Sequence, residues 1–205
     1  TEVILNTTAP TVSLTSGILT CSQTTTQINT TSSAVNATYF WMGPGINPTN
    51  QTQKNPVVDK IGTYSVLVTN TDNGCSTSST IIVNNDLSTA TAVALGGVLT
   101  CTQNDIQIFG SSNSNEVTYS WTGPGIVGSN TVANITASVV GTYSLVTTST
   151  VNGCSSSSVA VATLTNNLTT PTVTAGSSQT ITCAAPTVTL TGSATGGSNL
   201  SWSSG

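Results

Sequence analysis

The chain has 205 residues, enough for two or three small domains, and only 4% of them are charged. Two lysines against six acidic residues, with a net charge of −4 and no histidine, exclude the basic surface that binds nucleic acid. The chain contains 43 Thr and 29 Ser, and dispersed Val, Ile and Tyr residues favour folded β-structure over disorder. No apolar run approaches the ~18 residues that a membrane helix needs, so we expect no membrane insertion.

A period of about 80 residues runs along the chain and is the main signal. Cys21, Cys101 and Cys183 recur in LTCSQ, LTCTQ and ITCAA, and a Trp follows each after about 20 residues. IGTYSVLVTN recurs as VGTYSLVTTS, and NGCSTSS recurs as NGCSSSS. We therefore expect residues 1–9 to be the last strand and linker of a preceding repeat, 10–86 and 87–168 to be two complete repeats, and 169–205 to be the N-terminal half of a third, truncated repeat.

Each repeat is expected to consist of short strands separated by turns, without helices. In the second repeat the predicted strands, in chain order, are 93–101, 106–110, 117–123, 131–137, 142–150 and 157–165. About 80 residues with some seven strands predict an immunoglobulin-like antiparallel β-sandwich. The predicted fold class is all-β, with such domains in tandem.

A Trp-x-Gly-Pro-Gly segment begins at the end of the third predicted strand of each complete repeat. Val117, Tyr119 and Trp121 alternate and so share one strand face, which predicts that the Trp fills the core. The Pro and Gly residues then turn the chain, and the alternative is an exposed Trp that stacks on a sugar. The expected core tryptophans are Trp41, Trp121 and Trp202, and the expected turn residues are Gly43, Pro44, Gly45, Gly123, Pro124 and Gly125.

Asn-Gly pairs at Asn73–Gly74 and Asn152–Gly153 lie between β-rich runs. They predict tight hairpins in which both residues accept positive φ.

Each complete repeat holds two cysteines at matching places. The expected disulfides are Cys21–Cys75 and Cys101–Cys154, with the partner of Cys183 outside this sequence. Disulfides predict an oxidising, extracellular location, and the alternative is a set of buried, reduced thiols.

No catalytic, cofactor-binding or metal site is expected. Zinc would need close Cys pairs or His, and a Cys or Ser nucleophile would need a His base. The six acids are dispersed along the chain, so no paired carboxylates for acid–base chemistry stand out. A single ion near Asp86 is the one metal alternative. The sequence therefore favours a protein that is not an enzyme.

DKIGTYSV, which begins at Asp59, is similar to the D-x-G-x-Y-x-C signature of immunoglobulin domains. The likeness implies that Tyr64 and Tyr143 form tyrosine corners, in which the phenol bonds back to the backbone. Val66 and Leu145 stand where that signature has its cysteine, so this is not an antibody-type domain.

The whole cycle, LTC…W-x-GPG…GTYS…NGC, resembles the immunoglobulin-like or PKD-like repeats of very large Bacteroidetes surface adhesins. The resemblance covers essentially the whole chain and includes gliding-motility adhesins of the SprB kind, exported by type IX secretion. It implies a stalk or filament on the bacterial cell surface that presents a distal binding region. Its implied partners are neighbouring repeats, surface polysaccharide or other cell-surface proteins.

Two other functions stay open on the sequence. One is a filament subunit polymerised by donating the strand EVILN, from Glu2, to a neighbouring molecule. The other is a carbohydrate-binding module, which would need aromatic residues exposed in a row. Seven of the nine aromatic residues recur at fixed repeat positions, which favours the core.

Overall fold

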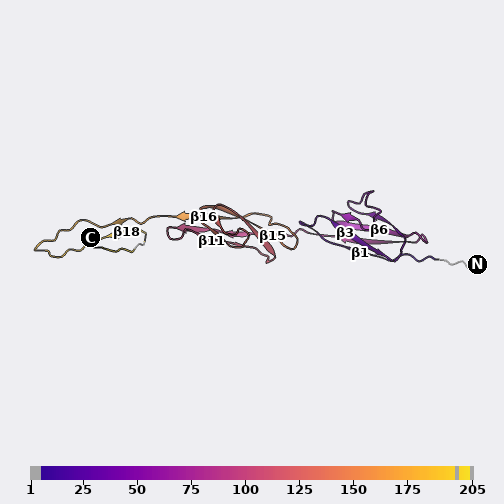
Figure 1. Cartoon of the computed structure of the whole chain (residues 1–205), viewed down its shortest axis with the longest axis horizontal. Coiled ribbons are helices and arrows are strands. Elements are labelled where there is room, and N and C mark those ends of the chain that lie inside the picture. Colours follow the sequence, from indigo (N-terminus) through magenta and orange to yellow (C-terminus); the bar gives the residue numbers. More distant parts are fainter. Residues whose placement is uncertain (1–5, 197–198, 204–205) are drawn as a thin grey trace, which may run out of the picture.

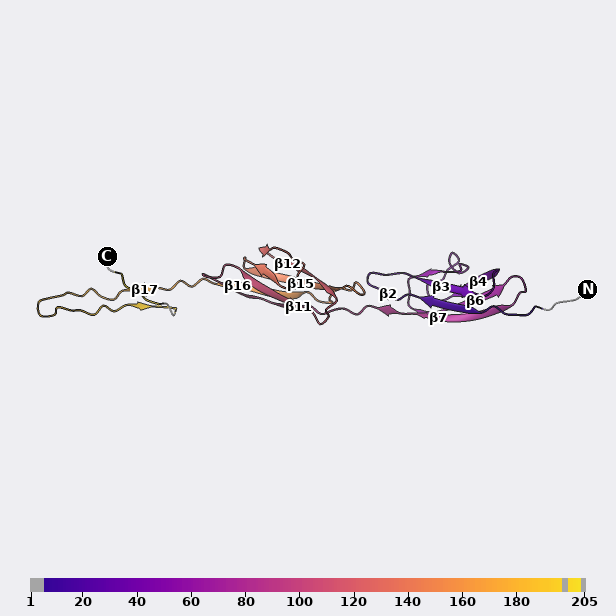
Figure 2. The same ribbon diagram turned by 60° about the horizontal axis from the view of Figure 1, so that its bottom comes forward.

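The computed structural model describes residues 6–196 and 199–203, which form two β-sandwiches in a row and a thinner third segment (Figure 1). All the secondary-structure elements among these residues are strands. A second view, turned about the long axis, shows the same end-to-end order (Figure 2). The predicted all-β fold of tandem immunoglobulin-like sandwiches is confirmed.

The first domain spans the strands from β1 to β8. One sheet has the order β1-β3-β5 and the other β4-β6-β7, while β2 and β8 form a parallel pair. The strands are β1 (Val12–Ser16), β2 (Leu19–Thr20), β3 (Thr26–Ser32), β4 (Ala37–Met42), β5 (Val57–Val58), β6 (Gly62–Asn70), β7 (Ser76–Val83) and β8 (Asn85–Asp86).

The second domain repeats this arrangement. Its sheets have the orders β10-β16-β15-β12 and β13-β14-β11-β9, and β10 again runs parallel to the last strand. The strands are β9 (Val93–Leu95), β10 (Gly97–Thr100), β11 (Ile106–Ser111), β12 (Val117–Thr122), β13 (Ile126–Val127), β14 (Ile135–Ala137), β15 (Gly141–Ser149) and β16 (Ala160–Asn167).

The first strand of each domain crosses from one sheet to the other, which the sequence did not predict. The expected strand 93–101 is broken at Gly96: β9 pairs with β11, whereas β10 pairs with β16. A side chain at Gly96 would collide with the backbone carbonyl of Thr163, so only glycine lets the strand approach its neighbour this closely. Gly17 marks the same switch between β1 and β2.

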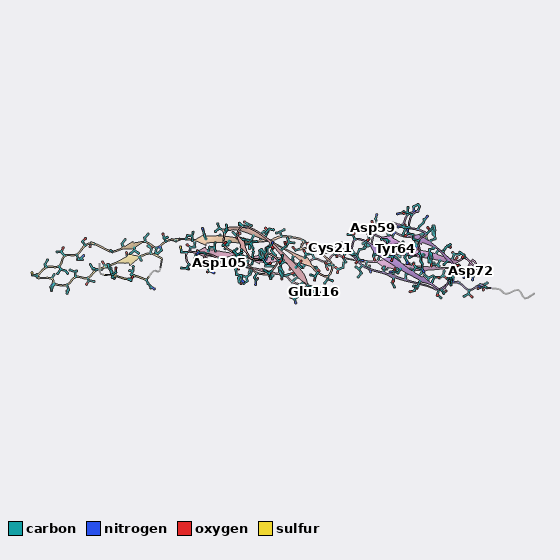
Figure 3. All side chains as sticks on the ribbon, viewed as in Figure 1. Cys21, Asp59, Tyr64, Asp72, Asp105 and Glu116 are labelled. Atoms are coloured by element: carbon teal, nitrogen blue, oxygen red, sulfur yellow. A yellow bond between two sulfur atoms is a disulfide. The ribbon has the colours of Figure 1, made fainter. Side chains whose placement is uncertain are left out.

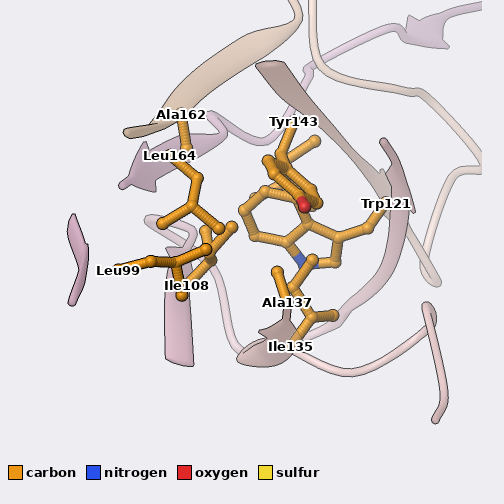
Figure 4. Packing of buried hydrophobic residues seen from close by; sticks show 9 residues of the cluster. Leu99, Ile108, Trp121, Ile135, Ala137, Tyr143, Ala162 and Leu164 are labelled. Atoms are coloured by element: carbon orange, nitrogen blue, oxygen red, sulfur yellow. The ribbon is translucent and has the colours of Figure 1, made fainter. Parts of the chain in front are cut away.

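The core of each domain comes from alternating positions on the long strands. In β6, Tyr64, Val66 and Val68 are fully buried, while Thr63 and Leu67 face solvent. The second domain has the equivalent cluster (Figure 4), made of Leu99, Ile108, Trp121, Ile135, Ala137, Tyr143, Leu145, Ala162 and Leu164. Val66 and Leu145, which replace the immunoglobulin cysteine, are thus buried apolar residues that fill the space between the sheets.

The third segment, residues 169–196 and 199–203, contains only the two-residue strands β17 (Val173–Thr174) and β18 (Ser193–Ala194). Trp202 is 57% exposed, so the expectation that it lies in a core is wrong for this structure. A tryptophan is buried when a second sheet covers it, and the described residues of this segment provide a single two-stranded ladder.

Candidate functional site: the interdomain junction

The Trp-x-Gly-Pro-Gly segments are internal corners of the two sandwiches. Trp41 and Trp121 are at most 1% exposed, and the Trp41 ring N–H donates to the carbonyl of Gln53 at 2.9 Å. The Trp121 ring N–H lies 3.1 Å from the carbonyl of Val132. Both rings are buried and both ring nitrogens donate to backbone carbonyls, so neither Trp presents a surface on which a sugar could stack.

The tyrosine of each repeat locks this corner. The Tyr64 hydroxyl lies 2.8 Å from the carbonyl of Pro44 and 2.7 Å from that of Lys60, and it can donate to either. Burial, with the nearby Asp59 carboxylate, raises the pKa of Tyr64. A Cβ at Gly62 would lie 2.8 Å from Pro44 Cγ, and one at Gly43 would lie 2.6 Å from Tyr64 Cδ1. Pro44 thus needs Gly62, and Tyr64 needs Gly43.

The second domain repeats the corner. The Tyr143 hydroxyl contacts the carbonyls of Pro124 and Val139. Burial raises the pKa of Tyr143 as well. Because the acceptor carbonyls of the two corners lie at equivalent positions of the repeat, the corners are structural parts of the repeat.

The disulfide does not lie within a domain: it joins Cys21 of the first domain to Cys154 of the second, with Cα atoms 5.0 Å apart. The expected pairings Cys21–Cys75 and Cys101–Cys154 are therefore wrong. Cys75, Cys101 and Cys183 are free thiols in this structure. Figure 3 labels Cys21 at the boundary between the two sandwiches.

Sheet topology explains why the intradomain pairing fails. Cys21 directly follows β2, which pairs with β8 (Asn85–Asp86), just beyond the C-terminal end of β7. Cys75 directly precedes β7, at the other end of that strand. Eight strand residues separate the two ends by about 26 Å, whereas a disulfide needs Cα atoms within about 7 Å.

The Asn-Gly hairpin of the second domain reaches back to the first. Asn152 is 3% exposed, and its side-chain oxygen accepts the Cys154 N–H at 3.0 Å. Its Nδ2 donates to the carbonyl of Ser88 at 2.9 Å, and its own carbonyl accepts from the Ser22 N–H at 3.1 Å. One asparagine thus shapes the cysteine turn, holds the linker and contacts the preceding domain.

These hairpins differ from the two-residue turn that Asn-Gly predicted. Positive φ is confined to glycine, 76° at Gly74 and 73° at Gly153. The Asn70 N–H donates to the Cys75 carbonyl at 2.9 Å, so four residues, 71–74, lie between this hydrogen-bonded pair. Asn takes its place there because its side chain caps the cysteine N–H, as in an Asx turn.

The linker between the domains has a turn of its own. The Ser88 N–H donates to Asp86 Oδ1 at 3.0 Å, and the Ser88 hydroxyl contacts the same oxygen. These hydrogen bonds, with a further one from Asn152, hold the pKa of the Asp86 carboxyl below its ordinary value. The carboxylate at the alternative ion position is thus engaged by protein donors.

The junction brings together Cys21, Ser22, Asp86, Ser88, Asn152 and Cys154, which we call the brace. Sequence reasoning singled out Cys21, Asn152 and Cys154 but missed the roles of Ser22 and Ser88. The available signal was the short polar residue that follows Cys21 and Cys101, and the recurrence of N/D-x-S/T in each linker. Among the described residues no group of three or more His, Cys, Asp or Glu could hold a metal ion. Likewise, that part of the chain has no helix long and apolar enough to cross a membrane.

Comparison with protein-family models and with curated proteins found no match. Among solved structures, the three N-terminal domains of the bacteriophage RB49 outer capsid protein Hoc are 17% identical, with TM-score 0.47, and the match covers 91% of this chain and 69% of that one.

Two further structures are similar. The eight N-terminal immunoglobulin domains of Down Syndrome Cell Adhesion Molecule are 8% identical, with TM-score 0.36 over 78% of this chain and 25% of that one. The fibronectin(III)-like modules of Clostridium thermocellum CbhA are 11% identical, with TM-score 0.31 over 77% of this chain and 95% of that one.

Proposed function

We propose that this chain is a non-catalytic, tension-bearing stalk segment of a long adhesin on the bacterial cell surface. Its repeats, 10–86 and 87–168, act as spacers that hold a distal binding region away from the cell. The observation that carries this proposal is the disulfide between neighbouring domains.

A second covalent connection changes how two domains move. The linker alone would leave a hinge, and the default expectation for small interdomain contacts is relative motion. Two covalent connections leave rotation only about the line that joins them, and the Asn152–Ser88 hydrogen bond restrains this further. The array therefore bends less than beads on a flexible string.

The same bond also redirects force. Tension applied beyond the brace passes from Cys21 directly to Cys154, so the loop between them, with a sequence separation of 133, lies outside the load path. Most of both sandwiches is within that loop. A stalk built this way keeps its length under load even when a domain opens.

The location follows from the same chemistry. Disulfides persist in oxidising compartments and are rare in the reducing cytosol, which supports an extracellular site. The hydroxyl-rich, weakly charged composition and the motif cycle that resembles Bacteroidetes adhesins support the bacterial surface. Gliding motility and type IX export are the finer parts of this proposal, with neighbouring repeats as the primary partners.

The carbohydrate-binding alternative loses support at particular residues, whereas strand donation stays a prediction. The aromatic side chains that a carbohydrate-binding face would need, Trp41, Trp121, Tyr64 and Tyr143, are buried in the two cores. Residues 2–5 of the strand proposed for donation lie outside the described residues.

Small-angle X-ray scattering of the whole chain tests the stiffening role. The variant Cys21→Ser/Cys154→Ser should show a smaller radius of gyration and a broader distance distribution, because the hinge is released. Cys75→Ser/Cys101→Ser, which removes two free thiols, is the matched control and should scatter like the parent. Identical scattering from all three proteins would contradict the proposal.

The long-array part has a separate test. A reducing, denaturing gel of the native polypeptide that carries this segment should show a mass far above 20.6 kDa, the mass of these 205 residues. A band at that mass would contradict the stalk and favour assembly between subunits.

A further inference from the structure

The first cysteine of every repeat lies in the same turn. Cys21, Cys101 and Cys183 are each the second residue of a turn closed by a backbone hydrogen bond from the preceding threonine. The three bonds are Thr20 N to Gln23 O (2.8 Å), Thr100 N to Gln103 O (3.1 Å) and Thr182 N to Ala185 O (3.1 Å). Of these equivalent turns, the first carries the cysteine that is bonded to the next domain.

The second cysteine of each complete repeat also has one geometry. The Cys75 N–H donates to Asn73 Oδ1 at 2.9 Å, as the Cys154 N–H does to Asn152 at 3.0 Å. Both hairpins close with a strand-end N–H bonded to the cysteine carbonyl at 2.9 Å. The thiol of Cys75 is therefore presented by the same scaffold as that of Cys154.

The linker contacts repeat as well. Asn73 Nδ2 donates to the carbonyl of Thr8 at 3.0 Å, and Thr8 stands 80 residues before Ser88, the acceptor for Asn152. The hairpin of the first domain thus already holds the linker ahead of it. After the second domain, the Thr169 N–H contacts Asn167 Oδ1 at 3.4 Å, the counterpart of the Ser88–Asp86 turn.

We propose that Cys75 and Cys101 are the two open halves of further braces of the same kind. Cys75 bonds the Thr-Cys turn of the immunoglobulin-like domain that precedes it in the polypeptide. Cys101 bonds the Asn-Gly-Cys hairpin of the domain that follows. The rule is that the first cysteine of each domain bonds the second cysteine of the next domain, and it rests on the proposed stalk function.

Each bond forms by thiol–disulfide exchange with a disulfide oxidant of the export compartment. One thiolate attacks the oxidant and releases one of its sulfurs as a thiol, and the second cysteine thiolate then displaces the other sulfur. Two protein thiols become one disulfide while one oxidant disulfide becomes two thiols. Cys101 is exposed and Cys75 half-buried, so both are open to this exchange.

Disulfide mapping of the native polypeptide tests the proposal. Free thiols are alkylated with iodoacetamide at extraction, and the unreduced protein is digested with Asp-N protease and chymotrypsin. Cleavage before Asp59, Asp72, Asp86 and Asp105 puts Cys21, Cys75 and Cys101 on separate peptides. Mass spectrometry then identifies the partner of each cysteine, and the Cys21–Cys154 pair serves as the internal reference.

The expected result is that Cys75 is recovered bonded to a Thr-Cys peptide and Cys101 to an Asn-Gly-Cys peptide of other repeats. Alkylated Cys75 and Cys101 beside an intact Cys21–Cys154 pair would overturn this inference and leave the stalk proposal standing. Recovery of Cys75 bonded to Cys101 would also overturn it, because the partner would then be a second copy. Intradomain pairs, Cys21–Cys75 and Cys101–Cys154, would overturn the inference and the stalk proposal together.

Discussion

At the scale of single residues, the tyrosine hydroxyl does the most specific work in each domain. Tyr64 is fully buried, and its hydroxyl reaches the carbonyls of Pro44 and Lys60. It ties the turn after β4 to the chain just before β6. Tyr64, which belongs to the immunoglobulin-like motif, thus also explains the Gly-Pro-Gly motif. The two motifs are distant in sequence, but Tyr64 contacts Pro44.

Replacing Tyr64 by Phe should therefore destabilise the first domain by about 1 to 2 kcal/mol, because the buried side chain loses the hydrogen bond that its hydroxyl donates to the carbonyl of Pro44 or Lys60. Urea unfolding followed by Trp fluorescence measures this change. Tyr39→Phe, at a half-exposed position outside the corner, is the matched control and should change stability by less than about 0.5 kcal/mol. Equal effects from the two variants would contradict the corner.

The raised pKa values of Tyr64 and Tyr143 predict an alkaline limit to stability. The folded state favours the neutral phenol, so this stabilisation is fully present below about pH 10, the ordinary tyrosine pKa. It is lost as the pH rises through the higher pKa of the folded protein. The urea midpoint of alkylated protein should be flat from about pH 8 and fall above about pH 10, with a weaker fall in Tyr64→Phe/Tyr143→Phe. A midpoint that stays flat throughout would contradict the assignment.

At the scale of elements, the Asn-Gly-Cys hairpin is one structure used in two surroundings. Gly74 and Gly153 have nearly equal positive φ, 76° and 73°. A Cβ added at Gly74 meets no atom within 4 Å, whereas one at Gly153 would lie 2.5 Å from Ser22 Cβ in the preceding domain. A substitution at Gly74 therefore tests backbone strain alone, whereas one at Gly153 tests strain together with contact across the junction.

Both glycine-to-alanine variants should lose about 1 to 2 kcal/mol from their own domain, because alanine is disfavoured in the left-handed region. Gly153→Ala should in addition speed reduction of Cys21–Cys154 by dithiothreitol, since the crowded hairpin moves away from Ser22. Gly74→Ala is the control and should leave that rate unchanged. A common rate in parent and both variants would show that the hairpin does not press on the junction.

At the scale of the whole molecule, the interdomain bond governs extension under force. The loop that it closes has a sequence separation of 133, and at ~3.6 Å per residue it stores roughly 480 Å of chain. Pulling on the oxidised chain from its two ends should not release this length. After reduction, or in Cys21→Ser/Cys154→Ser, single-molecule force spectroscopy should record that additional contour length. Its release from the oxidised parent would contradict the load path.

The strands, their inward faces and the buried Trp and Tyr follow from local pattern, because alternation and turn residues act within a few positions. This is why Trp121 could be placed in a core from Val117 and Tyr119 alone. The switch at Gly96 was missed because it depends on the approach of Thr163, far along the chain. The Asn-Gly hairpins were located correctly, but their turn type depended on a side-chain cap that propensity does not include.

The repeat also predicted that the cysteines form disulfides, but not which cysteines are partners. Equal spacing within each repeat favoured pairing inside a domain, whereas a bond depends on distance in space. The parallel strand pair places Cys21 at one end of its sandwich and Cys75 at the other. The end-to-end order of the domains then brings Cys21 to Cys154. Composition and periodicity therefore establish what each repeat is, while the brace arises from the way two folded repeats meet.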